Sequence, residues 1–538
     1  MTNIRLIQNR LHQAALSTAI SLLPLSGCDS LWSGFTMDVP VSDPCAKVTC
    51  AAPLICTPQS GMCVDPNSQP LSFSSIDPSV GPMGGFPVQI KGGGFTNTTK
   101  VLIDGQPVLL NTPITDTSSL SGITPKAKQV CVPLMLQLQR GTEPILSTAA
   151  QVTYQFNPFT VQGQRLLYNH LDIPTQIIGT QLDGNSKLDL LINFNKSAFV
   201  AIFNPDGVNT AGIATGIASN QIPADKIINL QPSSPGALST IFGFQGASKS
   251  AFIFSKQGST YTQIGSSYQS FSKQLKDATA VNLEGDSGDE VVVIACNLGT
   301  NGDYYALKPS ATGLTAINSR TASEELYAIA AAPSSTGLPA DTLFVTGVGH
   351  GATGGPKPGE GSVRIIDTRQ GPTPFVGFFV GTLPDGLRTI AAGDLDGDTH
   401  PDFVTYSTDS GLLYIGKYAD SYRNISKIDP RIGIGMAPYP MADIQLQDTN
   451  CDNKLDIIVA PRIGQYGPVI FLNNGAGNFT TEGAYLIDGT TKQPLQSGAP
   501  FAIMNINGDP LKDIVTSDTI GGAPSGAGIA VLFGSPQQ

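Results

Sequence analysis

The sequence predicts an all-β protein that contains a small disulfide module, an antiparallel β-sandwich and a seven-bladed β-propeller. Its 538 residues are enough for about three to four domains. Charged residues make up 13% and aromatic residues 7% of the chain, which favours many short strands over amphipathic surface helices. Residues 71–156 alternate in period two, and from about residue 165 onwards one pattern recurs.

The charge balance excludes one class of partner. The chain has 30 basic and 41 acidic side chains, a net charge of −11. Such a surface repels the phosphate backbone of nucleic acids and offers no polybasic patch to a membrane. We therefore expect no nucleic-acid partner.

Residues 1–27 are typical of an export signal. Arg5 and Arg10 precede an apolar run over 14–25, which is too short to cross a bilayer. The run ends in the tetrapeptide LSGC, which resembles the bacterial lipobox. This resemblance implies that Cys28 is lipidated and becomes the first mature residue. A cleaved signal followed by a chance cysteine is the alternative.

The lipobox resemblance implies a membrane partner and an envelope location. Acyl chains on Cys28 would hold the exported protein on a membrane. Asp29 would mark inner-membrane retention in enteric bacteria, but that rule does not extend to all bacteria. The choice of membrane stays open, and the outer membrane or the cell surface is our preferred location.

The next two segments are a tether and a cysteine module. Residues 28–44 lack any period and are typical of a spacer. Residues 45–64 contain Cys45, Cys50, Cys56 and Cys63, which in an exported protein predict two disulfides with three connectivities open. A zinc site is the competing interpretation, but C-x-x-C pairs and nearby histidines are missing. The segment loosely resembles the small EGF-like modules that follow lipoboxes in some bacteria.

Residues 70–156 are expected to form the sandwich. Glycine-rich turn signals at 84–85 and 92–94 separate its alternating stretches. The motifs IDP at 76–78, VQIKGGGF at 88–95 and VLIDG at 101–105 resemble an IPT/TIG domain, which implies an immunoglobulin-like fold. In that family the domain is usually a spacer or binding module and carries no catalytic residues.

Residues 165–536 contain seven repeats, and five of them share one polar loop. The spacing of roughly 50 to 60 residues fits four-stranded propeller blades. The five loops are 181–189 (QLDGNSKLD), 282–290 (NLEGDSGDE), 394–402 (DLDGDTHPD), 448–456 (DTNCDNKLD) and 505–513 (NINGDPLKD). Two further repeats, near 229–242 and 332–345, keep the flanking apolar runs without these polar residues.

The five loops predict calcium sites. Each has oxygen-bearing side chains at positions 1, 3, 5 and 9, and alternating positions in a tight turn can converge on a cation that prefers oxygen ligands. Position 7 can add its carbonyl, as at His400. The expected side-chain ligands are Gln181, Asp183, Asn185 and Asp189; Asn282, Glu284, Asp286 and Glu290; Asp394, Asp396, Asp398 and Asp402; Asp448, Asn450, Asp452 and Asp456; and Asn505, Asn507, Asp509 and Asp513. Polar turns that face water are the alternative.

A strand follows each loop, where an EF-hand would need a helix and a glutamate at position 12. The arrangement resembles the FG-GAP or VCBS repeats of integrin-type propellers, and VIFLNNGAGNF at 469–479 matches their hairpin ending. Glycine at position 4, as at Gly397, permits a positive φ. The loop 394–402 has four carboxylates and should bind best, and 448–456 should come next although Cys451 replaces the glycine.

Signals for catalysis are weak, so we expect no enzyme. The tetrad GDSG at 285–288 is similar to a serine-protease motif but lies within a calcium-type loop, and STDSGLLY at 407–414 is similar to a single sialidase Asp box. Cys131, Cys296 and Cys451 are expected to be buried free thiols.

The resemblances imply a recognition or adhesion module for proteins or glycans. A structural or assembly scaffold of the envelope is the second hypothesis, and a propeller-based glycan lyase or hydrolase is the third.

Overall fold

The computed structural model divides into two compact units, 1–65 and 66–538. The predicted signal segment 1–27 and the predicted tether 28–44 lie outside the described residues. No helix in the described part of the chain is long and apolar enough to cross a membrane. The structure describes residues 47–51, 54–56, 62–65, 69–82, 84–127, 131–155, 160–169, 174–180, 182, 189–194, 199–208, 214–219, 223–230, 240–257, 260–283, 289–332, 342–349, 357, 359–368, 377–430, 441–450, 452–461, 468–479, 484–485, 487–488, 500–504, 506, 513–518 and 528–534.

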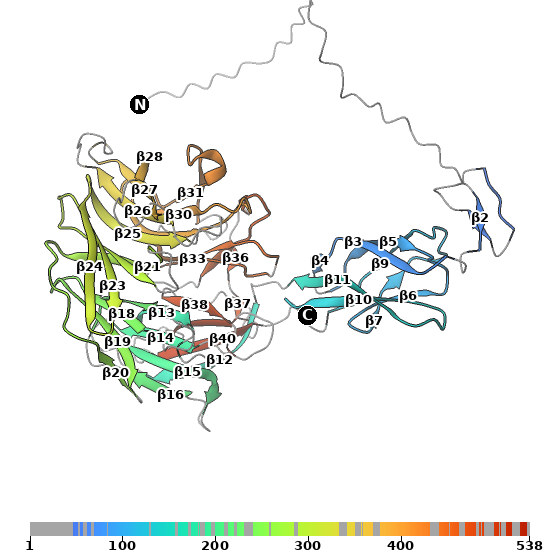
Figure 1. The fold of residues 1–538 in the computed structure, drawn as a ribbon, viewed down its shortest axis with the longest axis horizontal. Helices are drawn as coiled ribbons and strands as arrows, with labels where there is room; N and C mark the ends of the chain where they lie inside the picture. Colours follow the sequence, from blue (N-terminus) through green and yellow to red (C-terminus); the bar gives the residue numbers. More distant parts are fainter. Residues whose placement is uncertain are drawn as a thin grey trace, which may run out of the picture. The chain divides into compact units, whose positions relative to one another are not determined.

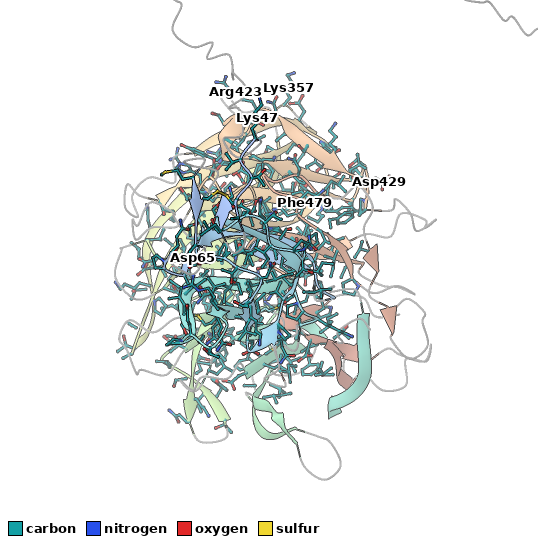
Figure 2. The ribbon with its side chains drawn as sticks, turned by 90° about the vertical axis from the view of Figure 1, so that its right-hand side faces the viewer. Lys47, Asp65, Lys357, Arg423, Asp429 and Phe479 are labelled. Carbon is teal, nitrogen blue, oxygen red and sulfur yellow. A yellow bond between two sulfur atoms is a disulfide. The ribbon has the colours of Figure 1, made fainter. Side chains whose placement is uncertain are left out.

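The first unit contains the cysteine module. Strands β1 (Ile55–Cys56) and β2 (Cys63–Val64) form an antiparallel pair. Cys50 and Cys63 form a disulfide, which closes a loop across 13 positions of the sequence. One disulfide of the predicted module is therefore present, while the side chains of Cys45 and Cys56 lie outside the described residues. Lys47 and Asp65, labelled in Figure 2, lie at the two ends of the described part of this unit.

The predicted sandwich is formed by two sheets. One has the order β3-β5-β9-β8 and the other the order β4-β11-β10-β6-β7. In β5 and β10 buried and exposed positions alternate, because one face of each sheet is turned to the shared core. The strands are β3 (Ser72–Asp77), β4 (Val80–Pro82), β5 (Pro87–Gly93), β6 (Thr99–Ile103), β7 (Gln106–Pro107), β8 (Leu109–Leu110), β9 (Ser119–Ile123), β10 (Pro133–Arg140) and β11 (Leu146–Gln155).

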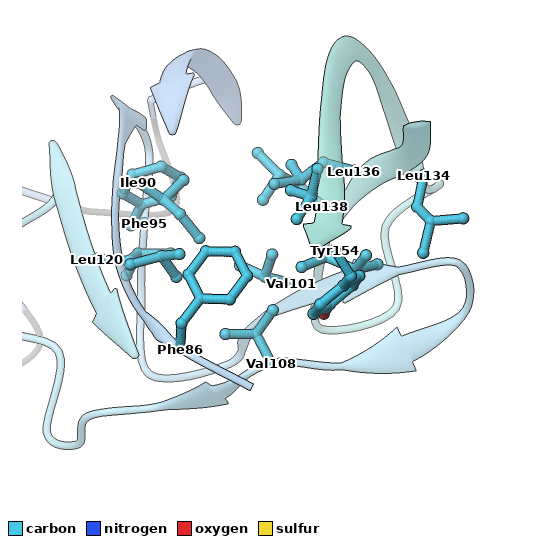
Figure 3. Packing of buried hydrophobic residues seen from close by; sticks show 13 residues of the cluster. Phe86, Ile90, Phe95, Val101, Val108, Leu120, Leu134, Leu136, Leu138 and Tyr154 are labelled. Carbon is cyan, nitrogen blue, oxygen red and sulfur yellow. The ribbon is translucent and has the colours of Figure 1, made fainter. Parts of the chain in front are cut away.

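The sandwich core is built from aromatic and branched side chains of both sheets (Figure 3). Phe86 and Tyr154 meet edge to face with 5.6 Å between their ring centroids. The Tyr154 hydroxyl donates to the carbonyl of Pro125. Arg140 is buried and donates to the carbonyls of Gln69 and Gly94, so one cation ties three segments together.

One cysteine prediction is wrong. Cys131 is disulfide-bonded and not a free thiol, because isolation along the sequence says nothing about distance in space. Cys296 is a buried free thiol, as predicted, and burial raises its pKa. Cys451 lies outside the described residues.

The rest of the described chain forms seven four-stranded antiparallel units in chain order, the first two joined in one eight-stranded sheet. Strand β12 completes the last unit by pairing with β40, so strands from both ends of this region share one sheet (Figure 1). The units are β13 (Pro174–Thr180), β14 (Asp189–Phe194), β15 (Val200–Val208) and β16 (Ala214–Ser219); β17 (Lys226–Leu230), β18 (Thr240–Gln245), β19 (Ser250–Gln257) and β20 (Thr260–Gln263); β21 (Leu275–Val281), β22 (Glu290–Ala295), β23 (Asp303–Ser310) and β24 (Gly313–Thr321); β25 (Glu324–Ala332), β26 (Thr342–Gly349), β27 (Gly361–Asp367) and β28 (Gly377–Leu383); β29 (Leu387–Gly393), β30 (Asp402–Ser407), β31 (Leu413–Gly416) and β32 (Ile425–Ile428); β33 (Met441–Gln447), β34 (Asp456–Pro461), β35 (Val469–Phe471) and β36 (Ala484–Tyr485); and β12 (Thr160–Asn169), β38 (Phe501–Met504), β39 (Asp513–Asp518) and β40 (Gly528–Gly534), with β37 (Ile487–Asp488) beside β12.

The first strands of successive units contact one another from β13 through β33, and β13 also contacts β38. The side chain of Gln445 in β33 donates to the carbonyl of Phe501 in β38 over 2.6 Å. The seven-bladed propeller stays a prediction. It is supported because the first strands of successive units contact one another around a closed ring, as they do in a propeller.

Stacking of the units explains the apolar runs after each loop. Strands β14, β22 and β30 are buried at every position, because a neighbouring unit covers each face. Phe344 of one unit packs against Phe403 and Tyr422 of the next. Each such strand is therefore packed on both faces from the residue at which the preceding loop ends.

Candidate metal centre

The loop 394–402 connects β29 to β30 and brings three carboxylates together. One oxygen each from Asp394, Asp396 and Asp398 lies within 4.8 Å of the other two. Among the described residues, this is the only group of three or more acidic, histidine or cysteine side chains close enough to share an ion. Positions 1, 3 and 5 of the sequence pattern therefore converge as expected.

Hydrogen bonds from backbone N–H groups to the carboxylates stabilise the turn. The two carboxylate oxygens of Asp394 accept from the N–H groups of Gly397 and Thr399, at 2.8 and 3.0 Å. Asp396 accepts from Asp398 N–H at 3.2 Å, and Asp398 accepts from His400 N–H at 2.8 Å. Each carboxylate is thus held by the turn it belongs to, which pre-organises the cluster.

Positive φ angles occur at two positions of this turn. Gly397, at position 4, has φ +77°, as its type predicts. Thr399, at position 6, has φ +71°, although threonine seldom adopts this region. The hydrogen bond from Thr399 N–H to Asp394 compensates for that conformation, which the sequence pattern did not indicate.

Burial, together with neighbouring like charges, raises the pKa of Asp396. Burial is the largest cause, and the charges of Asp398 and Asp394 add to it, while Lys417 opposes them. A cation placed among these side chains would favour their ionised forms. The cluster is therefore electrostatically suited to a positive ion.

The carboxylate at position 9 has a different place from the other three. Asp402 is fully buried, and its two oxygens accept from Leu395 N–H at 2.9 Å and from Tyr418 N–H at 2.8 Å. Burial raises the pKa of Asp402 to about 7, and the charges of Asp396 and Asp398 contribute. Asp402 therefore joins the start of the loop to the segment after β31.

The same contact recurs in all five loops. In each, the buried carboxylate at position 9 accepts from the backbone N–H of position 2 at 2.8 or 2.9 Å. We call this contact the loop clamp. The acceptor and donor pairs are Asp189 with Leu182, Glu290 with Leu283, Asp402 with Leu395, Asp456 with Thr449, and Asp513 with Ile506.

The loop 448–456 has the same turn. Asp448 accepts from Asp452 N–H at 3.1 Å and from Asn453 N–H at 2.9 Å, and Asn453 has φ +62° at position 6. Asn450, at position 3, also accepts from Asp452 N–H. The ammonium of Lys454 lies 3.6 Å from a carboxylate oxygen of Asp452, so this loop carries a cation of its own.

The hairpin 469–479 forms hydrogen bonds with both loops, 394–402 and 448–456. The backbone N–H of Asn473 donates to Asp456 at 2.9 Å. Its side-chain amide donates to the carbonyl of Leu395 at 2.7 Å and to that of Leu455 at 3.1 Å. Asn473 forms a bridge with Phe479, which is labelled in Figure 2. The motif NNGAGNF therefore positions both loops.

The remaining predicted ligands are only partly described. Asp189, Asn282, Glu290 and Asp513 are described, and the Lys308 ammonium lies 3.7 Å from Glu290. His400 stacks on Tyr418 with 4.0 Å between ring centroids. Gln181, Asp183, Asn185, Glu284, Asp286, Asn505, Asn507 and Asp509 lie outside the described residues, as does the GDSG tetrad at 285–288.

The segment 407–414 forms a hairpin turn. The hydroxyl of Ser407 donates to the carbonyl of Asp385 at 2.6 Å, and the Tyr414 hydroxyl donates to Ser410 at 3.1 Å. The first hydrogen bond fixes the turn to the segment before β29, and the second lies within the turn.

Comparisons with known proteins identify one domain. Residues 71–156 match the IPT/TIG domain family model, which confirms that part of the prediction. No curated protein matches the chain. Solved structures similar to this chain include BBS1N in complex with ARL6DN, with 11% identity, a TM-score of 0.42 and coverage of 68% of this chain and 98% of that one. An auxiliary nutrient binding protein from Bacteroides ovatus has 12% identity and a TM-score of 0.34, covering 88% and 99% of the two chains.

Proposed function

We propose that this protein is a calcium-binding recognition module, exported and lipid-anchored in the bacterial envelope, in which a seven-bladed propeller and an IPT/TIG domain present binding surfaces. The observation that carries the proposal is the convergence of Asp394, Asp396 and Asp398 in a loop type that recurs five times. Resemblance to FG-GAP or VCBS repeats supports the same assignment.

Calcium fits the donor set at 394–402. Three carboxylates supply hard oxygen ligands, and backbone carbonyls of the turn can complete the six to eight that Ca²⁺ prefers. Soft ligands such as thiolates are not part of the cluster. The ion would tie the turn to its base and stabilise the blades, with no chemical step.

The charge of the mature chain supports bound cations. Loss of Arg5 and Arg10 with the signal leaves 28 basic and 41 acidic side chains, a balance of −13. Fourteen of the acids are at ligand positions of the five loops. Five Ca²⁺ ions would bring the balance to about −3 and relieve repulsion between neighbouring carboxylates.

The proposed anchor is Cys28, and it has a direct test. Cys28→Ala should abolish membrane association while the rest of the chain still folds. Fractionation of cells that produce the two forms, with detection by antibody, measures this. An unchanged membrane fraction for Cys28→Ala would exclude the lipid anchor.

A recognition role and an envelope scaffold differ in where the protein faces. Protease added to intact cells should remove an adhesin from the surface and spare a periplasmic scaffold. We expect removal, together with calcium-dependent binding of the purified mature chain to a protein or glycan array. Full protection from protease in intact cells, with digestion after lysis, would favour the scaffold.

A further inference from the structure

The IPT/TIG domain has an open groove between β3 and β11. It has a volume of about 710 Å³ and is lined by residues 71–76, Ser79 and 146–151. The groove arises because the chain passes from one sheet of the sandwich to the other after β3. In the second sheet, strand β4 pairs in parallel with only the last part of β11, from Thr153 to Gln155. The first part of β11 therefore has no strand on that side among the described residues.

The floor of the groove is the exposed side of the domain core. Leu71, Phe73, Ile76, Leu146 and Ala150 all line it, and all are partly buried against the core cluster. Burial of these side chains by a ligand would gain about 25 cal/mol for each Å² of apolar surface removed from water. The groove thus offers hydrophobic contact at the same place where strand edges are open.

The rim is polar and uncharged. Ser72, Ser74 and Ser147 are exposed along the two strands, together with the small side chain of Ala149. The lining contains hydroxyls, one amide and small or apolar side chains, and no acidic or basic residue. In a chain of net charge −11 this uncharged surface excludes recognition through ion pairs, and it suits an uncharged ligand.

Both strands are irregular at the groove. The register of β3 against β5 shifts between Phe73 and Ser75, and that of β11 against β10 shifts beside residues 148–150. The backbone N–H of Ala150 donates to the Thr148 hydroxyl at 3.2 Å, and that hydroxyl donates to the carbonyl of Leu136 in β10 at 2.9 Å, so Thr148 fills the irregularity between β10 and β11. Irregularities of this kind hinder pairing of an edge strand with any other strand it meets. The side chains of a ligand must therefore fit the groove for it to bind.

We propose that this groove binds an extended, uncharged peptide segment of a partner protein. Apolar side chains at alternate positions of that segment enter the floor, and its backbone pairs with the open edge of β3 or β11. This is strand addition with pockets for every second residue. The proposal stands on the IPT/TIG domain alone and does not depend on calcium.

The test uses the full mature chain and a labelled nine-residue peptide that alternates valine with serine or threonine, with a lysine at each end for solubility. We expect a Kd of about 10 to 100 μM by fluorescence anisotropy. The same peptide with aspartate in place of valine should bind at least about tenfold more weakly. Hydrogen exchange should show new protection at residues 72–77 and 146–151.

Ser74→Arg and Ala149→Arg place a charge and bulk in the groove, and each should weaken peptide binding about tenfold. Gln89→Arg, at an exposed position of β5 outside the groove lining, is the matched control and should bind like the natural chain. No binding below about 1 mM, or equal binding by all variants, would overturn the proposal. A concentration-dependent dimer that Ser74→Arg abolishes would assign the groove to a second copy and also overturn it.

Discussion

The loops 394–402 and 448–456 have the same turn but a different charge. In both, position 1 accepts two backbone N–H groups, position 6 has a positive φ, and a loop clamp closes the base. The first gathers three carboxylates, whereas the second has Asn450 at position 3 and Lys454 beside Asp452. The comparison separates two properties of one motif. Hydrogen bonds from backbone N–H groups to the side chain at position 1 stabilise the turn, and the side chains at positions 3 and 7 set the difference in charge.

Removing a loop clamp should have the largest effect. Asp456 accepts from Thr449 N–H, from the Thr449 hydroxyl and from Asn473 N–H, so Asp456→Ala leaves buried donors unpaired. We expect a loss of about 3 kcal/mol in the free energy of unfolding, measured by urea in the presence of chelator. Asp409→Ala, an exposed acid, is the control and should cost less than about 0.5 kcal/mol. Equal effects would show that the clamp is unimportant for stability.

The pH dependence of the metal-free protein should be next in size. Burial raises the pKa of Asp402 to about 7 and that of Asp456 to about 6, so the folded chain binds more protons than the unfolded chain above about pH 4. Their contribution to stability is therefore greatest in acid and is lost as pH rises from about 4 to about 7. From about pH 6 to about pH 8 we expect a loss on the order of 2 kcal/mol in the free energy of unfolding, with a smaller slope in Asp402→Asn. An identical slope in that variant would contradict the assignment.

Exchanging the charge at position 3 should reverse which of the two loops, 394–402 or 448–456, binds calcium more tightly. Asp396→Asn removes one of three carboxylates and should weaken the tightest site about tenfold, which is about 1.4 kcal/mol. Asn450→Asp makes the opposite change in a loop of the same turn and should strengthen its site by a similar factor. Calorimetric titration of both variants measures these shifts. If neither affinity changes, charge count does not separate the loops.

The smallest expected effect is a change in calcium affinity when the side chain at position 7 is replaced. Lys454→Met removes an ammonium that competes with a cation at Asp452, and it should strengthen calcium binding by the loop 448–456 about threefold. Lys427→Met removes a lysine from β32, outside that loop, and should leave the affinity unchanged. A decrease in affinity for Lys454→Met would mean that the lysine supports the turn instead of competing with the ion.

The sequence was sufficient for the parts of the fold that depend on local pattern. Period-two alternation and glycine turns located the sandwich, and the recurring loops located β13 to β40 with their buried second strands. It also indicated that Asp394, Asp396 and Asp398 converge, because alternate positions of a tight turn must face the same side.

The rest depended on tertiary contacts. The loop clamp was not predicted, because the pattern shows an oxygen-bearing side chain at position 9 but not the backbone N–H that this side chain contacts. Its signal was present: position 9 is acidic in all five loops, while positions 1 and 3 vary between acid and amide. The disulfide at Cys131 and the bridging role of Asn473 connect segments far apart in sequence, so no local pattern could indicate them.

The central claim is that the five loops hold calcium and that the ions stabilise the repeat region. The most direct measurement is a calorimetric calcium titration of the mature chain, combined with thermal melts in calcium and in chelator. The account predicts about five bound ions, with the tightest site about tenfold weaker in Asp396→Asn, and a large rise in Tm with calcium. No heat of binding and identical melts in calcium and chelator would contradict it and leave the loops as polar turns.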